Sequence, residues 1–500
     1  MFDIKKLFSS KAERDEHNDM KNNRPVLDMD AIAGILKTNP CALGDFEKAY
    51  EKQAIEEPDY TDLFETSSKQ ASEIVRGRQS GASAEDAEAL DALKNRIVDE
   101  LLADTRVYVF DGKEGRIEDT KALPDGTPFV TNQDISAFPA AVRPQLAGEL
   151  MCKDLSGTTF PHLLYFYQQT MDDTIPEKNR QYAYNMFRQG LDILDLDAVT
   201  YEMLGQNKNS MGYWLPSLVS ACQSAPGSGL RIPATTVAKV PITLLQLSRK
   251  EYGELTKTTL DIVDSWAYHA FHLDESKDYF IKTGTYSSKF DFRNAHVTGA
   301  KEVRELGEYL LFIQNQAVLM AGPLTQPSIY GMSTTNEWVV REFIPDKEKN
   351  PCIYKGLPLH TEYRVFVDCD KDIILGQTPY WEPNVMKTRF AQGSDANSPH
   401  KKHDYVIYKS HEETLMKRYY ENLSRVLHGI QTILPHLNLP GQWAVDVMLN
   451  GDDLWIIDLS LAEQSFFYKA CVPEELRNPT NEDWIPTLPV PKAALPGRDD

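Results

Sequence analysis

Two aspartates near the end of the chain have the spacing of a cation site. Asp446 lies in an apolar segment whose tryptophan, valine and leucine residues recur every second position, as they do in a β-strand. Asp458 ends the next apolar segment, and Asn450-Gly451 between the two is typical of a tight hairpin turn. A buried carboxylate needs a paired charge or a bound cation. Two carboxylates that face one way therefore predict a hard oxygen site suited to Mg²⁺.

Three basic side chains lie in other segments with strand character. Lys282 ends KDYFIK, Arg341 lies within EWVVREFI, and Arg364 lies within EYRVFVD. An arginine in the middle of a strand usually has a carboxylate or a phosphate partner. For either arginine alone, an internal salt bridge is at least as good an explanation as a bound phosphate.

The segment that follows Lys282 has the composition of a phosphate-binding loop. It reads TGTYSSKFD and offers the hydroxyls of Thr283, Ser287 and Ser288 together with the charge of Lys289. Backbone N–H groups and hydroxyls in such a loop can surround phosphate oxygens. The segment is not a P-loop, and a surface turn has a similar composition.

The composition restricts the classes of protein to which this chain can belong. Of its 500 residues, 41% are hydrophobic and 25% are charged, as in globular proteins, and 53 basic and 74 acidic residues give a formal charge of −21. This charge argues against a general nucleic-acid or anionic-membrane binder. Neither a signal-peptide core nor a membrane-length apolar run is present, and six scattered cysteines indicate reduced core thiols. We therefore expect a cytoplasmic protein.

The patterns divide the chain into five regions. We expect a mainly helical region over residues 1–105, a mixed α/β linker domain over 106–206, and a proline-rich tail over 473–500. Helices are predicted at 254–270, 301–320 and 412–433, short strands at 106–110 and 127–131, and a polar loop at 391–404. Residues 207–280 and 281–472 carry the strands described above.

The order of these features resembles the ATP-grasp superfamily over about residues 207–470. It is most similar to the clade named for two signature arginines and one lysine, whose members come from phages and bacteria. A eukaryotic cell-cycle protein that helps to assemble a translation initiation factor is a more distant relative. The order and spacing of the segments carry this resemblance, because no single motif in it is diagnostic. Residues 1–206 match no family.

The resemblance implies an α+β fold in which two subdomains grip ATP, here with a pre-ATP-grasp subdomain at 207–280 and the ATP-grasp domain at 281–472. The roles carried over are phosphate binding by Lys282, a lid over the triphosphate at 283–289, a hinge that begins at Arg341, and adenine contacts from the backbone of Glu342, Phe343 and Ile344. Glu362 would then meet the ribose, Arg364 would face the γ-phosphate or the acyl-phosphate, and Asp446 and Asp458 would hold Mg²⁺ with Ser460 as a weaker third ligand.

Two positions depart from the ATP-grasp pattern. The second acidic motif of this superfamily is usually an acid followed two positions later by asparagine, whereas this chain has Asp458-Leu459-Ser460. The lid also contains a single glycine, Gly284. These departures place the second metal position and the reach of the lid in question.

Several functions are compatible with these features. The first is an ATP-dependent ligase that joins a carboxylate to an amine through an acyl-phosphate, on a peptide or protein end or on a small metabolite. The alternative is an ATP-binding assembly factor or chaperone that binds a partner protein with little or no catalysis. A kinase-like phosphotransferase is less favoured because the sequence has no HRD-type loop and no DFG motif. The acids and arginines can also simply pair with one another.

Overall fold

The computed structural model describes residues 84–146, 169, 172, 174–180, 182–183, 204–205, 207–248, 255–321, 335–391 and 399–478. The chain divides into two compact units, one formed by Met1–Tyr60, Gly157–Asp195 and Pro479–Asp500 and the other by Thr61–Ser156 and Leu196–Asn478. Nearly all described residues belong to the second unit, which is the subject of the following paragraphs. The five regions predicted from the sequence stay predictions.

The strands of this unit are β1 (Arg106–Phe110), β2 (Gly115–Asp119), β3 (Leu230–Arg231), β4 (Thr235–Lys239), β5 (Tyr279–Thr283), β6 (His296–Val297), β7 (Glu337–Glu342), β8 (Cys352–Ile353), β9 (Leu357–Pro358), β10 (Thr361–Asp368), β11 (Ile373–Pro379), β12 (Gln442–Asn450) and β13 (Asp453–Leu461). The α-helices are α6 (Ala84–Ala103), α7 (Asn132–Ser136), α11 (Met211–Ser224), α12 (Ile242–Leu247), α13 (Lys257–Ala270), α14 (Gly299–Arg304), α15 (Leu306–Ala321), α16 (Pro383–Ala391), α17 (Pro399–Ile433) and α18 (Tyr468–Cys471).

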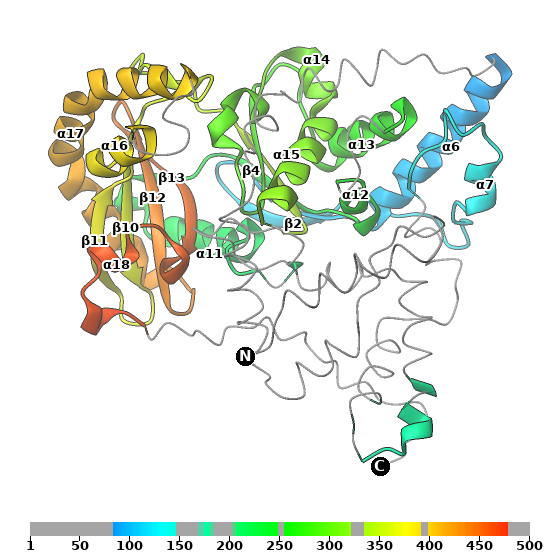
Figure 1. Ribbon diagram of the computed structural model, residues 1–500, viewed down its shortest axis with the longest axis horizontal. Helices are drawn as coiled ribbons and strands as arrows, with labels where there is room; N and C mark the ends of the chain where they lie inside the picture. Colours follow the sequence, from blue (N-terminus) through cyan, green and yellow to red (C-terminus); the bar gives the residue numbers. More distant parts are fainter. Residues whose placement is uncertain are drawn as a thin grey trace, which may run out of the picture. The chain divides into compact units, whose positions relative to one another are not determined.

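The first sheet, sheet A, is antiparallel throughout and has the strand order β2-β1-β4-β7-β5-β6. One of its faces packs against α6, α13 and α15 (Figure 1). Ile281 of β5 and Trp338 and Val340 of β7 point into this core, where Trp338 packs edge-on against Trp266 of α13 with ring centroids 5.5 Å apart. Because side chains alternate along a strand, the residues between them point to the opposite face. On that face lie Lys282 and Arg341.

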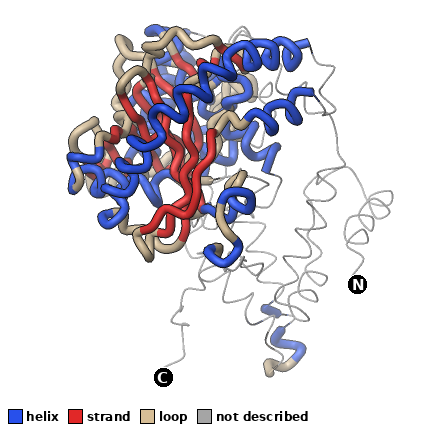
Figure 2. Tube along the Cα trace, turned by 90° about the vertical axis from the view of Figure 1, so that its left-hand side faces the viewer, coloured by secondary structure: helices blue, strands red, loops and turns tan. Residues whose placement is uncertain are grey.

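The second sheet, sheet B, has the order β11-β10-β12-β13-β3, and only β3 runs parallel to its neighbour. The odd-numbered residues of β10 and β12 pack in a core with α11 and α17. The even-numbered residues, among them Arg364 and Asp446, therefore face away from that core. In Figure 2 the strands of the unit run side by side with helices along them. The α+β fold class and the alternation predicted for 443–449 are confirmed.

A β-bulge in β13 decides where Asp458 points. Leu454 and Ile456 point into the core with α11, and a regular strand would send Asp458 the same way. The pairing shifts between Asp446 and Val447, so that Asp446 lies opposite Asp458 and Val447 opposite Ile456. Ile457 is the extra residue. The bulge therefore turns Asp458 away from the core, to the face that carries Asp446.

Two local predictions are wrong. Residues 127–131 form no strand, and the partner of β1 is instead β2, whose exposed charged side chains hide the strand pattern. Residues 399–404, predicted as loop, belong to α17, which extends the predicted helix at 412–433 toward its N-terminus. The helical prediction for 31–83 and the tail from residue 479 lie outside the described residues.

The four described cysteines are free thiols, as predicted. Cys369 is buried, Cys222 and Cys471 are partly buried, and Cys352 is exposed, so the expectation of core thiols holds only in part. Within the described ranges, no helix is both long enough and apolar enough to cross a membrane.

The core between sheet A and its helices should depend strongly on Trp338, which has no exposed surface and donates from Nε1 to Gln314. We expect Trp338→Ala to lower the free energy of unfolding by roughly 3–5 kcal/mol, because it leaves a large cavity. Tyr420→Ala on the exposed side of α17 is the control and should change it by less than about 0.5 kcal/mol. Urea denaturation measures both, and similar effects for the two variants would contradict this account.

Candidate functional site

A cavity of about 160 Å³ lies between the two sheets, and it is lined by residues far apart in the chain. Sheet A contributes Lys282 and Arg341, and sheet B contributes Glu362, Asp446 and Asp458. The predicted convergence of lysine, arginine and paired aspartates is what the structure shows. Arg364 lies at the same place through its ion pair with Asp446.

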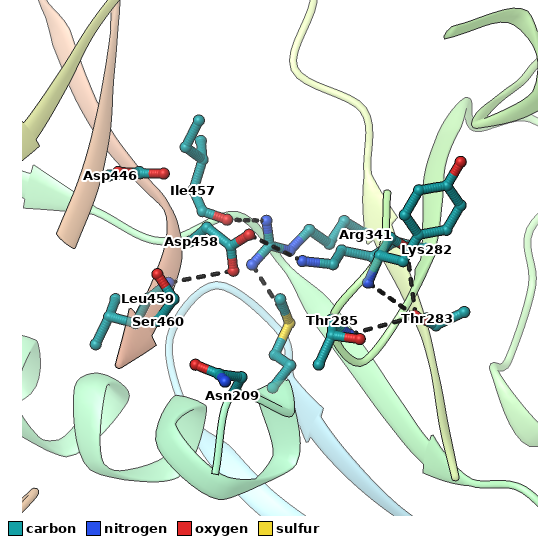
Figure 3. A network of polar contacts seen from close by, with 12 residues as sticks. Asn209, Lys282, Thr283, Thr285, Arg341, Asp446, Ile457, Asp458, Leu459 and Ser460 are labelled. Carbon is teal, nitrogen blue, oxygen red and sulfur yellow. Dashed lines mark hydrogen bonds and ion pairs between the residues drawn. The ribbon is translucent and has the colours of Figure 1, made fainter. Parts of the chain in front are cut away.

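Lys282 joins the two sheets by an ion pair. Its Nζ lies 3.1 Å from Oδ2 of Asp458, and only 2% of its side chain is exposed against 38% for Asp458 (Figure 3). Burial lowers the pKa of Lys282, while the charge of Asp458 opposes this shift and that of Arg341 adds to it. A buried ammonium with one carboxylate partner is suited to binding a further anion.

Arg341 forms the second link between the sheets. One terminal nitrogen donates to the carbonyl of Ile457 at 2.5 Å, and the other contacts Sδ of Met211 at 3.3 Å (Figure 3). Its Nε is buried and has no hydrogen-bond partner among the described residues. Burial lowers the pKa of Arg341 to about 10. The bulge in β13 thus exposes a carbonyl to Arg341 and also orients Asp458.

Arg364 and Asp446 form a bidentate ion pair on adjacent strands of sheet B. Nε donates to Oδ1 at 2.8 Å and Nη2 donates to Oδ2 at 2.7 Å, and β10 and β12 place the two residues directly opposite each other. The guanidinium also lies 4.9 Å from the ring centroid of Tyr380. Burial disfavours its charge, but Asp446, Asp458 and Glu362 outweigh this and raise the pKa of Arg364.

The aspartate pair fits a magnesium ion. Asp446 and Asp458 are opposite each other in the register and line the same cavity. Asp458 accepts from Lys282 and from the Leu459 N–H, the latter at 3.1 Å. Mg²⁺ is commonly held by one or two carboxylates, with waters and substrate phosphates completing its six ligands. These two carboxylates supply the protein share of such a set.

The opposite end of the cavity is apolar and aromatic. It is lined by Phe280, Phe292, Phe343 and Met448 with the chain at Ile344. Phe280 and Phe292 stack with centroids 5.9 Å apart. A planar base is the kind of group that such walls accommodate. The hinge backbone predicted at residues 342–344 borders this end.

Glu362 is the buried acid of the cavity wall. Burial raises the pKa of its carboxyl to about 7, the charge of Lys289 opposes the shift, and that of Asp446 adds to it. Its position on β10, two residues before Arg364, places it on the same face of sheet B. A carboxyl that stays partly protonated near neutral pH can both donate and accept a hydrogen bond.

Only some of the residues predicted to bind phosphate in the loop after Lys282 line the cavity. Ser287 and Lys289 line the cavity, and Nζ of Lys289 lies 4.4 Å from the ring centroid of Tyr380. Thr283 is buried and accepts from the N–H groups of its own turn (Figure 3). Ser288 is buried in a left-handed conformation and donates to Gln316 at 2.8 Å. The hydroxyls of Thr283 and Ser288 therefore stabilise the loop and do not line the cavity.

Ser460 also lies outside the cavity lining. Its hydroxyl oxygen is 2.7 Å from that of Ser465, so the two hydroxyls form a hydrogen bond. In this arrangement Ser460 supplies no ligand to a second metal position. The structure brings together Lys282, Arg341, Arg364 and the two aspartates, and it does not bring Ser460 to them.

Sequence reasoning missed a partly buried acid that fixes the start of α11. Glu337 on β7 accepts from Ser210 Oγ and from the Gly212 N–H, the latter at 2.8 Å. Burial raises the pKa of Glu337. A carboxylate at a helix N-terminus also interacts favourably with the helix dipole. Because α11 begins at Met211, this contact holds Met211 against Arg341. Gly212 and Glu337 are 125 positions apart in the sequence, so their contact leaves no local signal.

A second cluster missed by the sequence lies in the loop after the hinge. Ligand atoms of Asp346, Glu348 and His360 lie within 4.8 Å of one another. The amide of Asn350 fills the centre, with Nδ2 at 3.1 Å from Asp346, 3.4 Å from Glu348 and 3.3 Å from His360. Arg418 donates to its Oδ1 at 2.9 Å and so fixes the amide orientation. The cluster is satisfied internally and ties the loop to α17.

Comparisons with known proteins add little. No protein-family profile and no curated protein matches the sequence. Among solved structures, the chain is similar to C-terminally truncated Cdc123 from Schizosaccharomyces pombe, with 13% identity and a TM-score of 0.29 over 56% of this chain and 94% of that chain. It is similar to Cdc123 from the same organism with 14% identity and a TM-score of 0.27 over 52% and 85%. Similarity at such TM-scores supports no conclusion about function, so the function is inferred from the strands and side chains of this chain.

The raised pKa of Glu362 predicts a specific pH dependence. Since its pKa of about 7 in the folded chain exceeds the ordinary 4.5, folding binds a proton, and the contribution of this group to stability falls as pH rises from about 5 to about 7.5. Glu362→Gln should therefore be more stable than the unaltered protein by on the order of 2–3 kcal/mol at pH 8 and about equal at pH 4.5. Urea unfolding across pH tests this, and a pH-independent difference would contradict it.

The Arg364–Asp446 pair predicts a marked non-additivity. Arg364→Met should cost roughly 3–5 kcal/mol of stability, because it leaves the carboxylate of Asp446 buried without its partner. The double variant Arg364→Met/Asp446→Leu should be less destabilised than this single variant. Urea unfolding of the single and double variants measures the coupling. Strictly additive losses would show that the two side chains do not depend on each other.

Proposed function

We propose that this chain binds Mg²⁺ and ATP in the cavity between sheets A and B, in the manner of ATP-grasp proteins. The observation that supports this most is the meeting of Lys282 and Arg341 from sheet A with Arg364, Asp446 and Asp458 from sheet B. An apolar end with the hinge backbone lies next to this charged end. A nucleoside triphosphate needs the same combination, with an apolar slot at one end and cations with metal ligands at the other.

The basic and the acidic residues of the cavity would have different roles. Lys282 and Arg364 would neutralise phosphate oxygens, and Asp446 and Asp458 would hold Mg²⁺, which supplies the charge that bridges adjacent phosphates. Each of these groups has a partner within the cavity in the absence of a nucleotide, as Lys282 has Asp458 and Arg364 has Asp446. Binding would therefore exchange internal ion pairs for ligand contacts. This exchange avoids leaving a buried charge unpaired at any stage.

The bound nucleotide would act on the arrangement of the two sheets. Lys282 and Arg341 both reach from sheet A to β13, so a ligand that replaces these contacts changes what holds the sheets together. We propose on this basis a nucleotide-dependent factor that binds a partner protein.

A carboxylate–amine ligase is the second candidate, and one observation favours it. Lys289 and Arg364 both lie against the ring of Tyr380, where a substrate carboxylate would find two cations beside the phosphate-binding groups. In that reaction a carboxylate oxygen attacks the γ-phosphorus and ADP leaves. An amine then attacks the acyl-phosphate carbon and phosphate departs.

Loss of the two bridging charges should abolish nucleotide binding. We expect Lys282→Ala and Asp458→Ala each to weaken binding of Mg²⁺ and ATP by about a hundredfold or more, because each removes a charged contact to the triphosphate or its metal. Lys417→Ala is the matched control, since this lysine of α17 is exposed and outside the cavity lining. Isothermal titration calorimetry measures all three. Full binding by either cavity variant would remove that residue from the site.

Turnover separates the two candidates. A ligase releases ADP and phosphate only when a carboxylate and an amine are both supplied. A binding factor retains intact ATP and captures its partner in a nucleotide-dependent manner. A coupled ADP assay over carboxylate and amine panels, run beside a mass measurement of bound nucleotide, decides between them. ADP formation that requires both substrates would overturn the binding-factor proposal.

A further inference from the structure

Asn450 does not have the role that its sequence context predicts. The Asn450-Gly451 pair marks the hairpin turn correctly, but Asn450 is the last residue of β12 and pairs with Asp453. Only Gly451 of this pair has a positive φ, at 63°, and the two-residue loop is Gly451-Asp452. The turn therefore does not require an asparagine at position 450. Yet Asn450 has no exposed surface at all, so its amide must be satisfied within the protein.

The amide of Asn450 grips the segment that follows the hinge. Its Nδ2 donates to the carbonyl of Pro345 at 2.9 Å, and its Oδ1 accepts from the Lys347 N–H at 2.9 Å. One partner is an acceptor and the other is a donor, so this orientation alone satisfies both. The side chain thus binds the backbone of residues 345–347 in the way that a neighbouring strand would.

This grip fixes one end of the segment that lines the apolar end of the cavity. On the sheet A side, the N–H groups of Glu342 and Phe343 donate to the carbonyls of Ala234 and Asp278, each at 3.0 Å. Ile344 lies between the last bond to sheet A and the first bond to Asn450. Its N–H has no hydrogen-bond partner within the described residues. The segment is therefore held at both ends and leaves one amide free between them.

A single strand connects this grip to the metal end. Asp446, Met448 and Asn450 occupy alternate positions of β12, so they project from the same face at intervals of about 6.6–6.8 Å. Asp446 and Met448 both line the cavity, the first at its charged end and the second at its apolar end. The register of β12 thus sets the position of the hinge backbone relative to the two aspartates.

We infer that Asn450 is a positioning residue that determines which nucleobase the cavity accepts. This inference depends on the nucleotide-binding function proposed above. A free N–H at Ile344 would complement adenine, which offers an acceptor at N1 beside a donor at N6. Guanine offers the reverse pattern of a donor at N1 beside an acceptor at O6. Loss of the grip would let residues 343–347 shift and weaken this discrimination, while the triphosphate contacts remain.

Binding measurements on Asn450 variants test this inference. In Asn450→Asp, a carboxylate oxygen replaces the donor and faces the carbonyl of Pro345, and in Asn450→Ala both bonds are lost. We expect both variants to bind ATP about tenfold to a hundredfold more weakly in the presence of Mg²⁺, with the ratio of ATP to GTP affinity falling toward one. Binding of inorganic tripolyphosphate should stay within about twofold, because it does not use the hinge.

The control is Asp452→Asn, which exchanges an acid for an amide at an exposed position of the same turn. It should leave the ratio of ATP to GTP affinity unchanged. Hydrogen exchange at the Lys347 amide gives a second readout and should accelerate in both Asn450 variants. An unchanged ratio, or an equal loss of ATP, GTP and tripolyphosphate, would overturn the inference alone. If the unaltered protein binds no nucleotide, the proposed function fails and the inference fails with it.

Discussion

The ion pair between Lys282 and Asp458 is the interaction on which the arrangement of this site depends. It joins a strand of sheet A to a strand of sheet B, and its lysine is almost completely buried. A buried ammonium is tolerated only with a charged partner, so the two sheets must meet at this point for either to be stable there. Three further features support this contact between the sheets. They are the packing of α11, the bulge in β13 and the hydrogen bond from Arg341 to Ile457.

The same charges explain why two interpretations of the sequence were difficult to separate. Arg364 does pair with Asp446, as an internal salt bridge would require. That pairing alone does not distinguish a binding site from a structural ion pair. What distinguishes them is the surrounding cavity, in which three cationic and four acidic residues line one space together with an aromatic slot and an uncommitted hinge amide. Ion pairs with a purely structural role rarely line a cavity that combines charged, aromatic and unbonded backbone groups.

The strands and their charged residues could be predicted because their signal is local. A period of two places Asp446 and Arg364 on the polar face of strands whose other face is apolar, and the structure agrees. The bulge at Ile457 could not be predicted, since Ile456 and Ile457 are equally apolar and either could point inward. The loop hydroxyls of Thr283 and Ser288 resemble phosphate ligands in the sequence, but Thr283 accepts hydrogen bonds within its own turn and Ser288 donates to Gln316 of α15.

Contacts that match no known sequence motif account for the remaining differences. Glu337 caps α11 across 125 residues, and Asn350 gathers Asp346, Glu348 and His360 around an amide. Neither contact produces a periodic pattern or a fixed spacing. Asn450 is a different case, because its sequence signal was real but belonged to Gly451, and its own contacts lie with Pro345 and Lys347. A turn motif can thus conceal a residue whose partners are more than a hundred positions away.

The bulge in β13 makes the site sensitive to the parity of chain length. Because Ile457 is one residue in excess, its deletion would remove the bulge and leave an odd spacing between Leu454 and the second aspartate, which keeps that aspartate on the cavity face. Removal of two residues would leave an even spacing without a bulge and send the aspartate into the apolar core. Homologues that keep both aspartates in use should therefore have this interval either at its present length with the bulge or one residue shorter without it.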